Sequence, residues 1–100
     1  MFFVIHAIDK PASLELRLKT RPAHLDYLTA AGQTVIAAGP TLTEDGAGMT
    51  GSVVIIEAAD RAGAEAFACN DPYAKAGLFD STTIMPWRKV FLNTPRDTAN

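Results

Sequence analysis

Two side chains in this chain combine acid–base chemistry with a sequence context that could pair them, His24 and Asp71. His24 lies in the stretch LKTRPAHLDY at residues 18–27, in what we expect to be the first turn of a helix. A histidine near a helix N-terminus feels the positive end of the helix dipole, which disfavours imidazolium and leaves a ring nitrogen free to accept a proton. Asp71, in the stretch CNDPYAKAG, is the expected partner. The two residues therefore predict a general base supported by a carboxylate.

Both residues also have simpler explanations. A single histidine is often a partly buried structural residue that forms local hydrogen bonds, and spacing alone favours that interpretation here. Asp71 directly precedes Pro72, which is the preferred arrangement at the N-cap of a helix. The residue pattern by itself leaves the pairing open.

The elements that must position these residues follow from the apolar pattern. We predict strands at residues 2–8, 34–38, 53–56 and 79–87, and helices from residue 20 or 21 to Gly32 and from the cap Asp60 to Asn70. Residues 13–18 fit either a helical turn or an extended piece. Pro22 places the start of the first helix, because proline is favoured in a first turn and disfavours helical geometry in the residue before it. Residues 41–50 are predicted to be a loop, and Asp71–Pro72 begins a further turn that ends at Gly77.

The order β, α, β, β, α, β predicts an α+β, ferredoxin-like fold with an antiparallel four-stranded sheet. Two helices cover only one face of such a sheet, yet residues 2–8 and 53–56 are apolar on both faces. Burial of one Val or Ile side chain is worth about 1.5–3 kcal/mol. We therefore expect a second copy on the open face, as in a dimeric α/β barrel. Residues 1–92 are predicted to form the domain and residues 93–100 a polar, disordered tail.

Composition excludes several classes of protein. With 100 residues, 48% of them hydrophobic, the chain suits one domain, and a net charge of −2 indicates neither nucleic acid nor a membrane as partner. Trp87 beside two cations is better explained as a strand end or dimer rim than as a base-stacking site. A single cysteine predicts no internal disulfide framework and fits a cytoplasmic location. Because the two histidines are distant and no cysteine pair is present, we also predict no metal site. No apolar run approaches the roughly 20 residues of a membrane helix, and the first strand lacks the features of a signal peptide.

Five motifs, in order, resemble those of the YciI (YCII-related) family over residues 1–92. They are RPAHLDYL at 21–28, AGP at 38–40, TGS at 50–52, NDPYAKAGL at 70–78 and MPWRKVF at 85–91. The resemblance implies the dimeric ferredoxin-like barrel and a His-Asp active-site pair at His24 and Asp71. It also implies that Arg17 corresponds to the arginine ahead of the histidine, and that Gly51 and Ser52 correspond to the GS motif.

The resemblance also suggests a reaction class. One branch of the family is associated with dehydrochlorination of chlorinated hydroquinones, and the wider fold superfamily includes muconolactone isomerases. Both remove a proton from a small ring compound without a metal or organic cofactor. On this interpretation Asp71 holds the His24 tautomer, Arg17 binds an anionic substrate oxygen, Ser52 donates a hydrogen bond and Tyr73 lines the pocket. The alternatives are a solvated Arg17 and a Ser52 that merely begins a strand.

Three hypotheses about function follow. The first is a small cofactor-free lyase or isomerase that acts on an aromatic or anionic small molecule. The second is a non-catalytic small-molecule-binding or accessory domain, and the third makes His24 and Asp71 helix caps only. Gly39, Pro40 and Gly51 are expected to be turn residues and not site residues.

Overall fold

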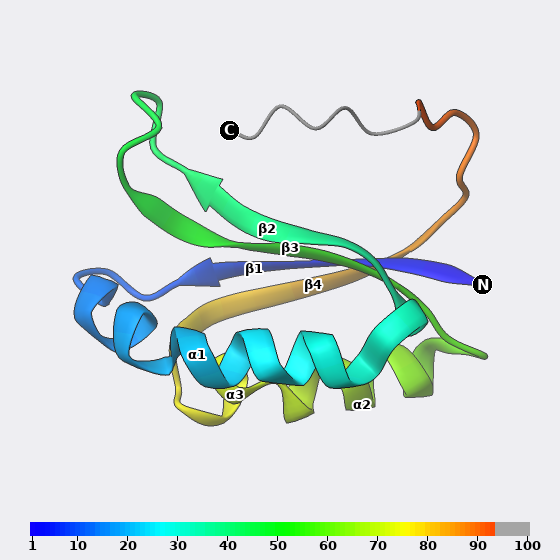
Figure 1. Ribbon diagram of the computed structural model, residues 1–100, viewed down its shortest axis with the longest axis horizontal. Helices are drawn as coiled ribbons and strands as arrows, with labels where there is room; N and C mark the ends of the chain where they lie inside the picture. Colours follow the sequence, from blue (N-terminus) through cyan, green and yellow to red (C-terminus); the bar gives the residue numbers. More distant parts are fainter. Residues whose placement is uncertain (94–100) are drawn as a thin grey trace.

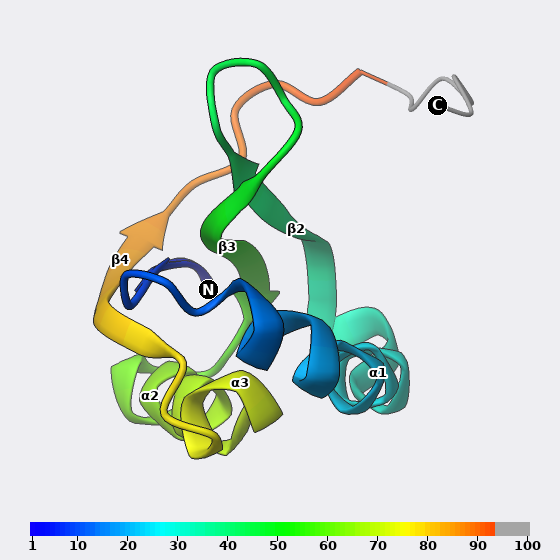
Figure 2. The same cartoon turned by 90° about the vertical axis from the view of Figure 1, so that its left-hand side faces the viewer.

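The computed structural model describes residues 1–93, so all but the first residue of the predicted tail lies outside the described residues. Its elements, in chain order, are β1 (Phe2–Asp9), α1 (Leu14–Ala31), the 3-10 turn η1 (Gly32–Thr34), β2 (Val35–Leu42), β3 (Met49–Glu57), α2 (Arg61–Asn70), α3 (Pro72–Lys75) and β4 (Phe79–Trp87). The four strands form one antiparallel sheet in the order β2-β3-β1-β4. All three helices lie against the same face of that sheet (Figures 1 and 2). The predicted α+β ferredoxin-like fold is confirmed.

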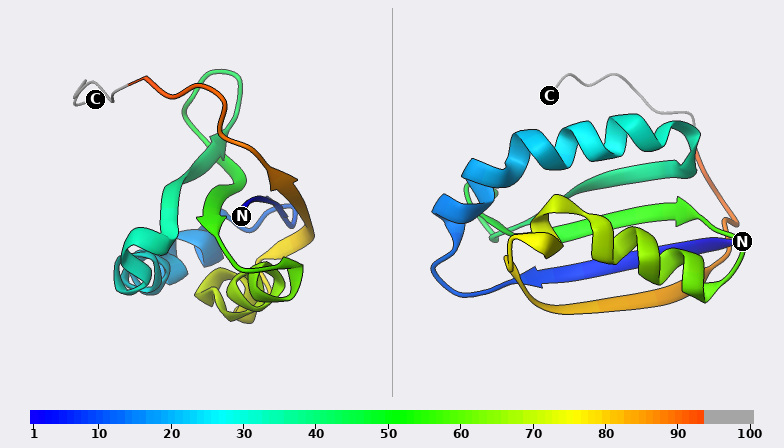
Figure 3. Two further views of the ribbon diagram at one scale, coloured as in Figure 1. Left: turned by 90° about the vertical axis from the view of Figure 1, so that its right-hand side faces the viewer. Right: turned by 90° about the horizontal axis from the view of Figure 1, so that it is seen from below.

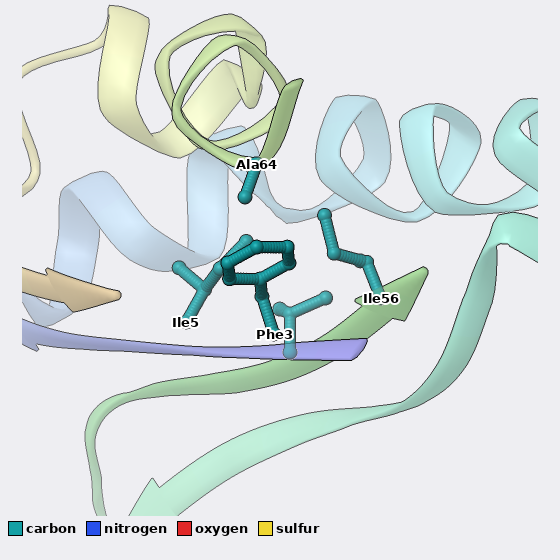
Figure 4. Close-up of a cluster of buried hydrophobic side chains, with 5 residues drawn as sticks. Phe3, Ile5, Ile56 and Ala64 are labelled. Carbon is teal, nitrogen blue, oxygen red and sulfur yellow. The ribbon is translucent and has the colours of Figure 1, made fainter. Parts of the chain in front are cut away.

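The core is built by side chains of the two central strands, β1 and β3, which point alternately to the two faces of the sheet. Phe3, Ile5 and Ala7 of β1 are buried, and the register pairs Phe3 with Ile56 and Ile5 with Val54 of β3. The side chains of Phe3, Ile5 and Ile56 point toward the helices, where they meet Ala64 of α2 (Figure 4). The small methyl group of Ala64 is fully buried, which allows the helix to pack close to the sheet.

The other residues of the same strands face away from the helices. Val4 pairs with Ile55 of β3 and with Met85 of β4, and Phe2 pairs with Trp87. These side chains are partly or largely exposed. Figure 3 shows that α1, α2 and α3 lie on one side of the sheet only, and the described residues place no element over the other. The prediction that β1 and β3 are apolar on both faces is confirmed.

The predicted start of the first helix is wrong. Helix α1 begins at Leu14 and continues through Pro22, so residues 13–18, which fitted helix or strand, are helical after Ser13. Proline removes one backbone hydrogen bond from a helix, but the turn before it is held by Arg17, whose side chain is anchored to other elements. His24 therefore lies about three turns after the helix start. The dipole argument for its protonation state fails, because that effect falls off within the first turn.

The β2–β3 hairpin is longer than predicted. The strands predicted at residues 34–38 and 53–56 span Val35–Leu42 and Met49–Glu57, with residue 34 in the turn η1. Gly39, Pro40 and Gly51 therefore lie inside strands and not in turns. The hydroxyl groups of Thr41 and Thr50 form a hydrogen bond of 2.8 Å between the two strands. This cross-strand bond helps to explain why polar residues that were predicted to form a loop lie in strands instead. Pro40 is tolerated because β2 is an edge strand.

Gly51 tests the packing of this hairpin, because a Cβ atom there would collide with the carbonyl oxygen of Ala7 in β1. We expect Gly51→Ala to lower the free energy of unfolding by about 1–3 kcal/mol, measured by urea denaturation. Gly63→Ala in α2 is the matched control, because its Cβ would make only ordinary contacts at 3.5 Å. Equal stabilities for the two variants would contradict the close approach of β1 and β3.

Candidate active site

The structure brings His24 and Asp71 into direct contact. His24 Nδ1 lies 2.9 Å from Asp71 Oδ1, and both side chains are more than nine-tenths buried. A carboxylate only accepts hydrogen bonds, so Nδ1 donates its proton in this contact, and in the neutral imidazole Nε2 then carries the lone pair. The arrangement is that of an imidazole held in one tautomer and free to accept a proton at Nε2.

Asp71 has a second role in the fold. The same Oδ1 atom accepts a hydrogen bond of 2.9 Å from the backbone N–H of Tyr73, so Asp71 is the N-cap of α3. The capping explanation for Asp71 is therefore correct, and it is compatible with the pairing. The cap orients the carboxylate, because the bond from Tyr73 N–H leaves Asp71 little freedom to turn away from His24.

Tyr73 packs between the functional groups. Its ring stacks on His24 at a centroid distance of 4.1 Å, and the Cζ atom of Arg17 lies 4.4 Å from the ring centroid. Only 1% of Tyr73 is exposed. Burial raises the pKa of Tyr73, although the charges of Arg17 and Arg21 act in the opposite direction. The phenol therefore stays neutral at physiological pH and can donate a hydrogen bond.

Arg17 is a buried cation, so its interpretation as a solvated charge is wrong. Its Nε and Nη2 atoms donate to the two carboxylate oxygens of Asp9 at 2.7 and 2.9 Å, and Nη2 also donates to Ser52 Oγ at 2.8 Å. Burial alone would lower the pKa of Arg17, but the hydrogen bonds and charge of Asp9 outweigh it and raise the pKa above the ordinary value of an arginine. The residue is always charged. Ser52, which lies within β3, accepts this bond and keeps its hydroxyl hydrogen for another acceptor.

Four of these residues, Arg17, His24, Ser52 and Tyr73, line one pocket of about 130 Å³. Their carboxylate partners Asp9 and Asp71 are not part of its lining. Arg17, Arg21, His24, Leu25 and Leu28 of α1 form one wall. Arg17, Arg21, His24 and Leu28 recur at intervals of three or four and share one face of the helix, and Leu25 follows Arg21 at an interval of four. The β2–β3 hairpin and α3 supply the rest of the lining, namely Ala38, Gly39, Pro40, Met49, Ser52 and Tyr73. A cavity of about 150 Å³ accepts benzene, so this pocket suits a ligand of one six-membered ring.

Sequence reasoning missed Asp9 and Arg21. Asp9 was assigned only to the end of the first strand, and nothing in the local pattern shows that it faces a buried arginine. Arg21 was treated as part of the helix start. Its spacing of three from His24 would have placed it on the pocket wall if the helix had been predicted to begin at residue 14.

Two further findings concern the described residues 1–93. They contain no group of three His, Cys, Asp or Glu side chains arranged to hold a metal ion. None of their helices is long and apolar enough to cross a membrane.

Comparison with known proteins identifies the family. A model of the YCII-related domain matches residues 1–88. Protein YciI of Escherichia coli O6:H1 is 42% identical over 98 residues, which covers 91% of this chain and all of that protein. The chain belongs to the YCII-related family.

Solved structures extend the comparison. The 5-chloro-2-hydroxyhydroquinone dehydrochlorinase TftG from Burkholderia phenoliruptrix AC1100, in complex with 2,5-dihydroxybenzoquinone, is 39% identical with a TM-score of 0.81, over 88% of this chain and 94% of that one. An antibiotic biosynthesis monooxygenase has a TM-score of 0.53 at 18% identity, over 90% of this chain and 99% of that one. The second likeness concerns the fold alone.

The stability of the fold is expected to depend on the ion pair between Arg17 and Asp9. Removal of one partner from a buried ion pair leaves an uncompensated charge and costs about 3–5 kcal/mol. We expect Asp9→Ala to lower the free energy of unfolding by that amount in urea denaturation. Asp26→Ala, at an exposed carboxylate of α1, is the control and should change it by less than about 0.5 kcal/mol. A loss below about 1 kcal/mol for Asp9→Ala would show that Arg17 does not depend on this partner.

Proposed function

We propose that this protein is a small enzyme in which His24, oriented by Asp71, removes a proton from a hydroxylated ring compound and so drives an elimination or isomerisation. Dehydrochlorination of a chlorinated hydroquinone is the specific reaction that we favour. The single observation that carries the proposal is the 2.9 Å His24–Asp71 contact at a ring-sized pocket. It is supported by 39% identity to TftG, a dehydrochlorinase.

The reaction is balanced without an external oxidant or reductant. A chlorinated hydroquinone first takes up its keto form, in which a hydroxyl proton has moved to the ring carbon that bears chlorine and the O–H electron pair has become part of a C=O bond. Removal of a second hydroxyl proton forms the second C=O bond of the quinone, while the ring double bond shifts toward the carbon that releases chloride, so the net loss is one proton and one chloride. Chloride departs with the electron pair of the C–Cl bond. The protein must therefore supply a proton acceptor and stabilise the charge that develops on oxygen. Nothing in this scheme calls for a cofactor, and the scheme suits the cytoplasmic location that we propose for the protein.

Each neighbouring residue has a place in the proposal. Asp71 fixes the tautomer of His24 and stabilises the imidazolium that forms when Nε2 takes the proton. Ser52, whose oxygen is already occupied by Arg17, donates its hydrogen to the substrate. Tyr73 forms the wall against which the imidazole stacks. Arg17 holds Ser52 and Tyr73 in place, since Asp9 and Ser52 already occupy its Nε and Nη2 groups.

A second copy of the chain is proposed to cover the open face of the sheet. Four strands of eight or nine residues present about 500 Å² of flat face, from spacings of about 4.8 Å between strands and 3.3 Å between residues. Two copies would bury about 1,000 Å² in total, which is the lower bound for a specific interface. Residues 88–93 rise from β4 on this side (Figure 1), and Val90, Phe91 and Leu92 expose 85%, 78% and 63% of their surface. They enlarge the apolar surface available to the partner.

Exchange of His24 tests the catalytic proposal. We expect His24→Asn to lower the rate of chloride release from 5-chloro-2-hydroxyhydroquinone by about 10²- to 10⁴-fold, because the proton acceptor is lost. The matched control is His6→Asn, the same change at a histidine on the opposite face of the sheet, which should leave the rate unchanged. Chloride is measured with an ion-selective electrode. Full activity in His24→Asn would remove His24 from the mechanism, and saturable binding without chloride release by the unmodified protein would favour a binding module.

The assembly has its own test. Sedimentation equilibrium of the unmodified chain is expected to give twice its mass of 10.7 kDa. Ile55→Lys places a charge at the centre of the open face and should yield monomers, because a charge is not buried without a partner. Leu18→Lys, at a half-exposed leucine of α1 on the other side of the molecule, should leave the dimer intact. A monomeric unmodified chain would refute the proposed assembly.

A further inference from the structure

The basic side chains that line the pocket differ in whether a carboxylate holds them. The guanidinium of Arg17 is held by both carboxylate oxygens of Asp9, and the imidazole of His24 is held by Asp71. Arg21 is different, since within residues 1–93 its side chain forms neither an ion pair nor a hydrogen bond with another side chain. The pocket therefore contains one cation whose charge the described part of the fold has not used.

The position of Arg21 suits contact with a ligand. It lies on the pocket wall one helical turn before His24, and it is exposed where His24 and Tyr73 are buried. The buried pair thus forms the floor of the pocket and Arg21 its rim. The charge of Arg21 also reaches the floor, because it acts to lower the pKa of Tyr73.

We propose that Arg21 determines specificity by binding an anionic oxygen of the ligand, so that the pocket selects single-ring compounds that carry a phenolate, an acidic quinone hydroxyl or a carboxylate. The proposal rests on the proposed function in that it uses the same pocket. It assigns anion recognition to Arg21 instead of Arg17. A guanidinium provides several N–H donors in a planar fork, which matches oxygen anions, and charge-assisted hydrogen bonds are about twice as strong as neutral ones.

Arg17 is poorly placed for this role. Two of its three guanidinium nitrogens, Nε and Nη2, already donate to Asp9 and Ser52, and only 3% of its side chain is exposed. A ligand anion would also compete with a carboxylate that is fixed in contact with the same guanidinium. Arg21 has no such competitor within the described residues, so its charge is available to a ligand at little cost in existing contacts.

The test compares an anionic and a neutral ring by isothermal titration calorimetry. The anionic probe is 2,5-dihydroxybenzoquinone, whose acidic hydroxyls are ionised at neutral pH, and the neutral probe is hydroquinone. We expect Arg21→Gln to weaken binding of the anionic probe by about 10- to 100-fold, as for loss of a hydrogen bond to a charged group. Binding of hydroquinone should change by less than about twofold. Arg21→Lys should retain part of the affinity for the anion, because it keeps the charge without the planar fork.

The matched control is Lys19→Gln, which removes the same charge from α1 two residues earlier, on the opposite side of the helix. It should leave both affinities within about twofold, and circular dichroism should show all variants folded. Unchanged binding of the anion by Arg21→Gln, or an equal loss for both probes, would overturn the assignment and leave the proposed reaction standing. Failure of the unmodified protein to bind either probe would overturn both. Normal binding that depends on Arg21 but produces no chloride release would support this inference while refuting the proposed function.

Discussion

The structure depends on the burial of one cation. A guanidinium in the interior loses its hydration, and it is tolerated only where several acceptors replace the water. Asp9 supplies two carboxylate oxygens and Ser52 a hydroxyl, so Arg17 ties the end of β1 to the start of α1 and to β3. These contacts hold the first turns of α1 ahead of Pro22. They thereby set the direction of the helix that carries both His24 and Arg21.

Asp71 makes a comparable connection on the other side of the pocket. One carboxylate oxygen accepts both the N–H that begins α3 and the Nδ1–H of His24. This oxygen therefore links the junction of α2 and α3 to the middle of α1. Tyr73 follows two residues later and packs against His24 and Arg17. The chemistry of the pocket and the stability of these helix junctions use the same contacts, so a change in one affects the other.

The sheet has two apolar faces and helices on only one. On the helical side the side chains of β1 and β3 meet Ala64 of α2 (Figure 4). On the other side Val4, Ile55 and Met85 lie beside one another with nothing over them in the described residues. An exposed apolar surface of this extent is typical of an interface. A partner there would stabilise the sheet from the face that the pocket does not use, and the pocket would remain open at its own rim.

Local rules account for the parts of the fold that were predicted correctly. Alternation in residues 2–8 assigned each side chain of β1 to the correct face, and Asp60 caps α2 through the N–H of Gly63 as expected. Local rules fail at Pro22 and Gly51, because contacts with residues distant in the sequence decide the structure there. Contacts from distant elements allow the helix to continue through Pro22, and the close approach of Ala7 explains Gly51 without any turn.

The candidate site divides in the same way. Residue types and the family motifs were enough to name His24, Asp71, Ser52 and Tyr73, because each stands in a recognisable stretch of sequence. Arg17 lies ahead of the motif at residues 21–28 and was named only through the family resemblance. Only the tertiary structure decided that Arg17 is buried against Asp9 while Arg21 faces the pocket. The reason is physical: hydrophobic period and helix caps depend on neighbours in the chain, whereas the environment of a charge depends on which oxygen atoms of other elements the fold brings within reach.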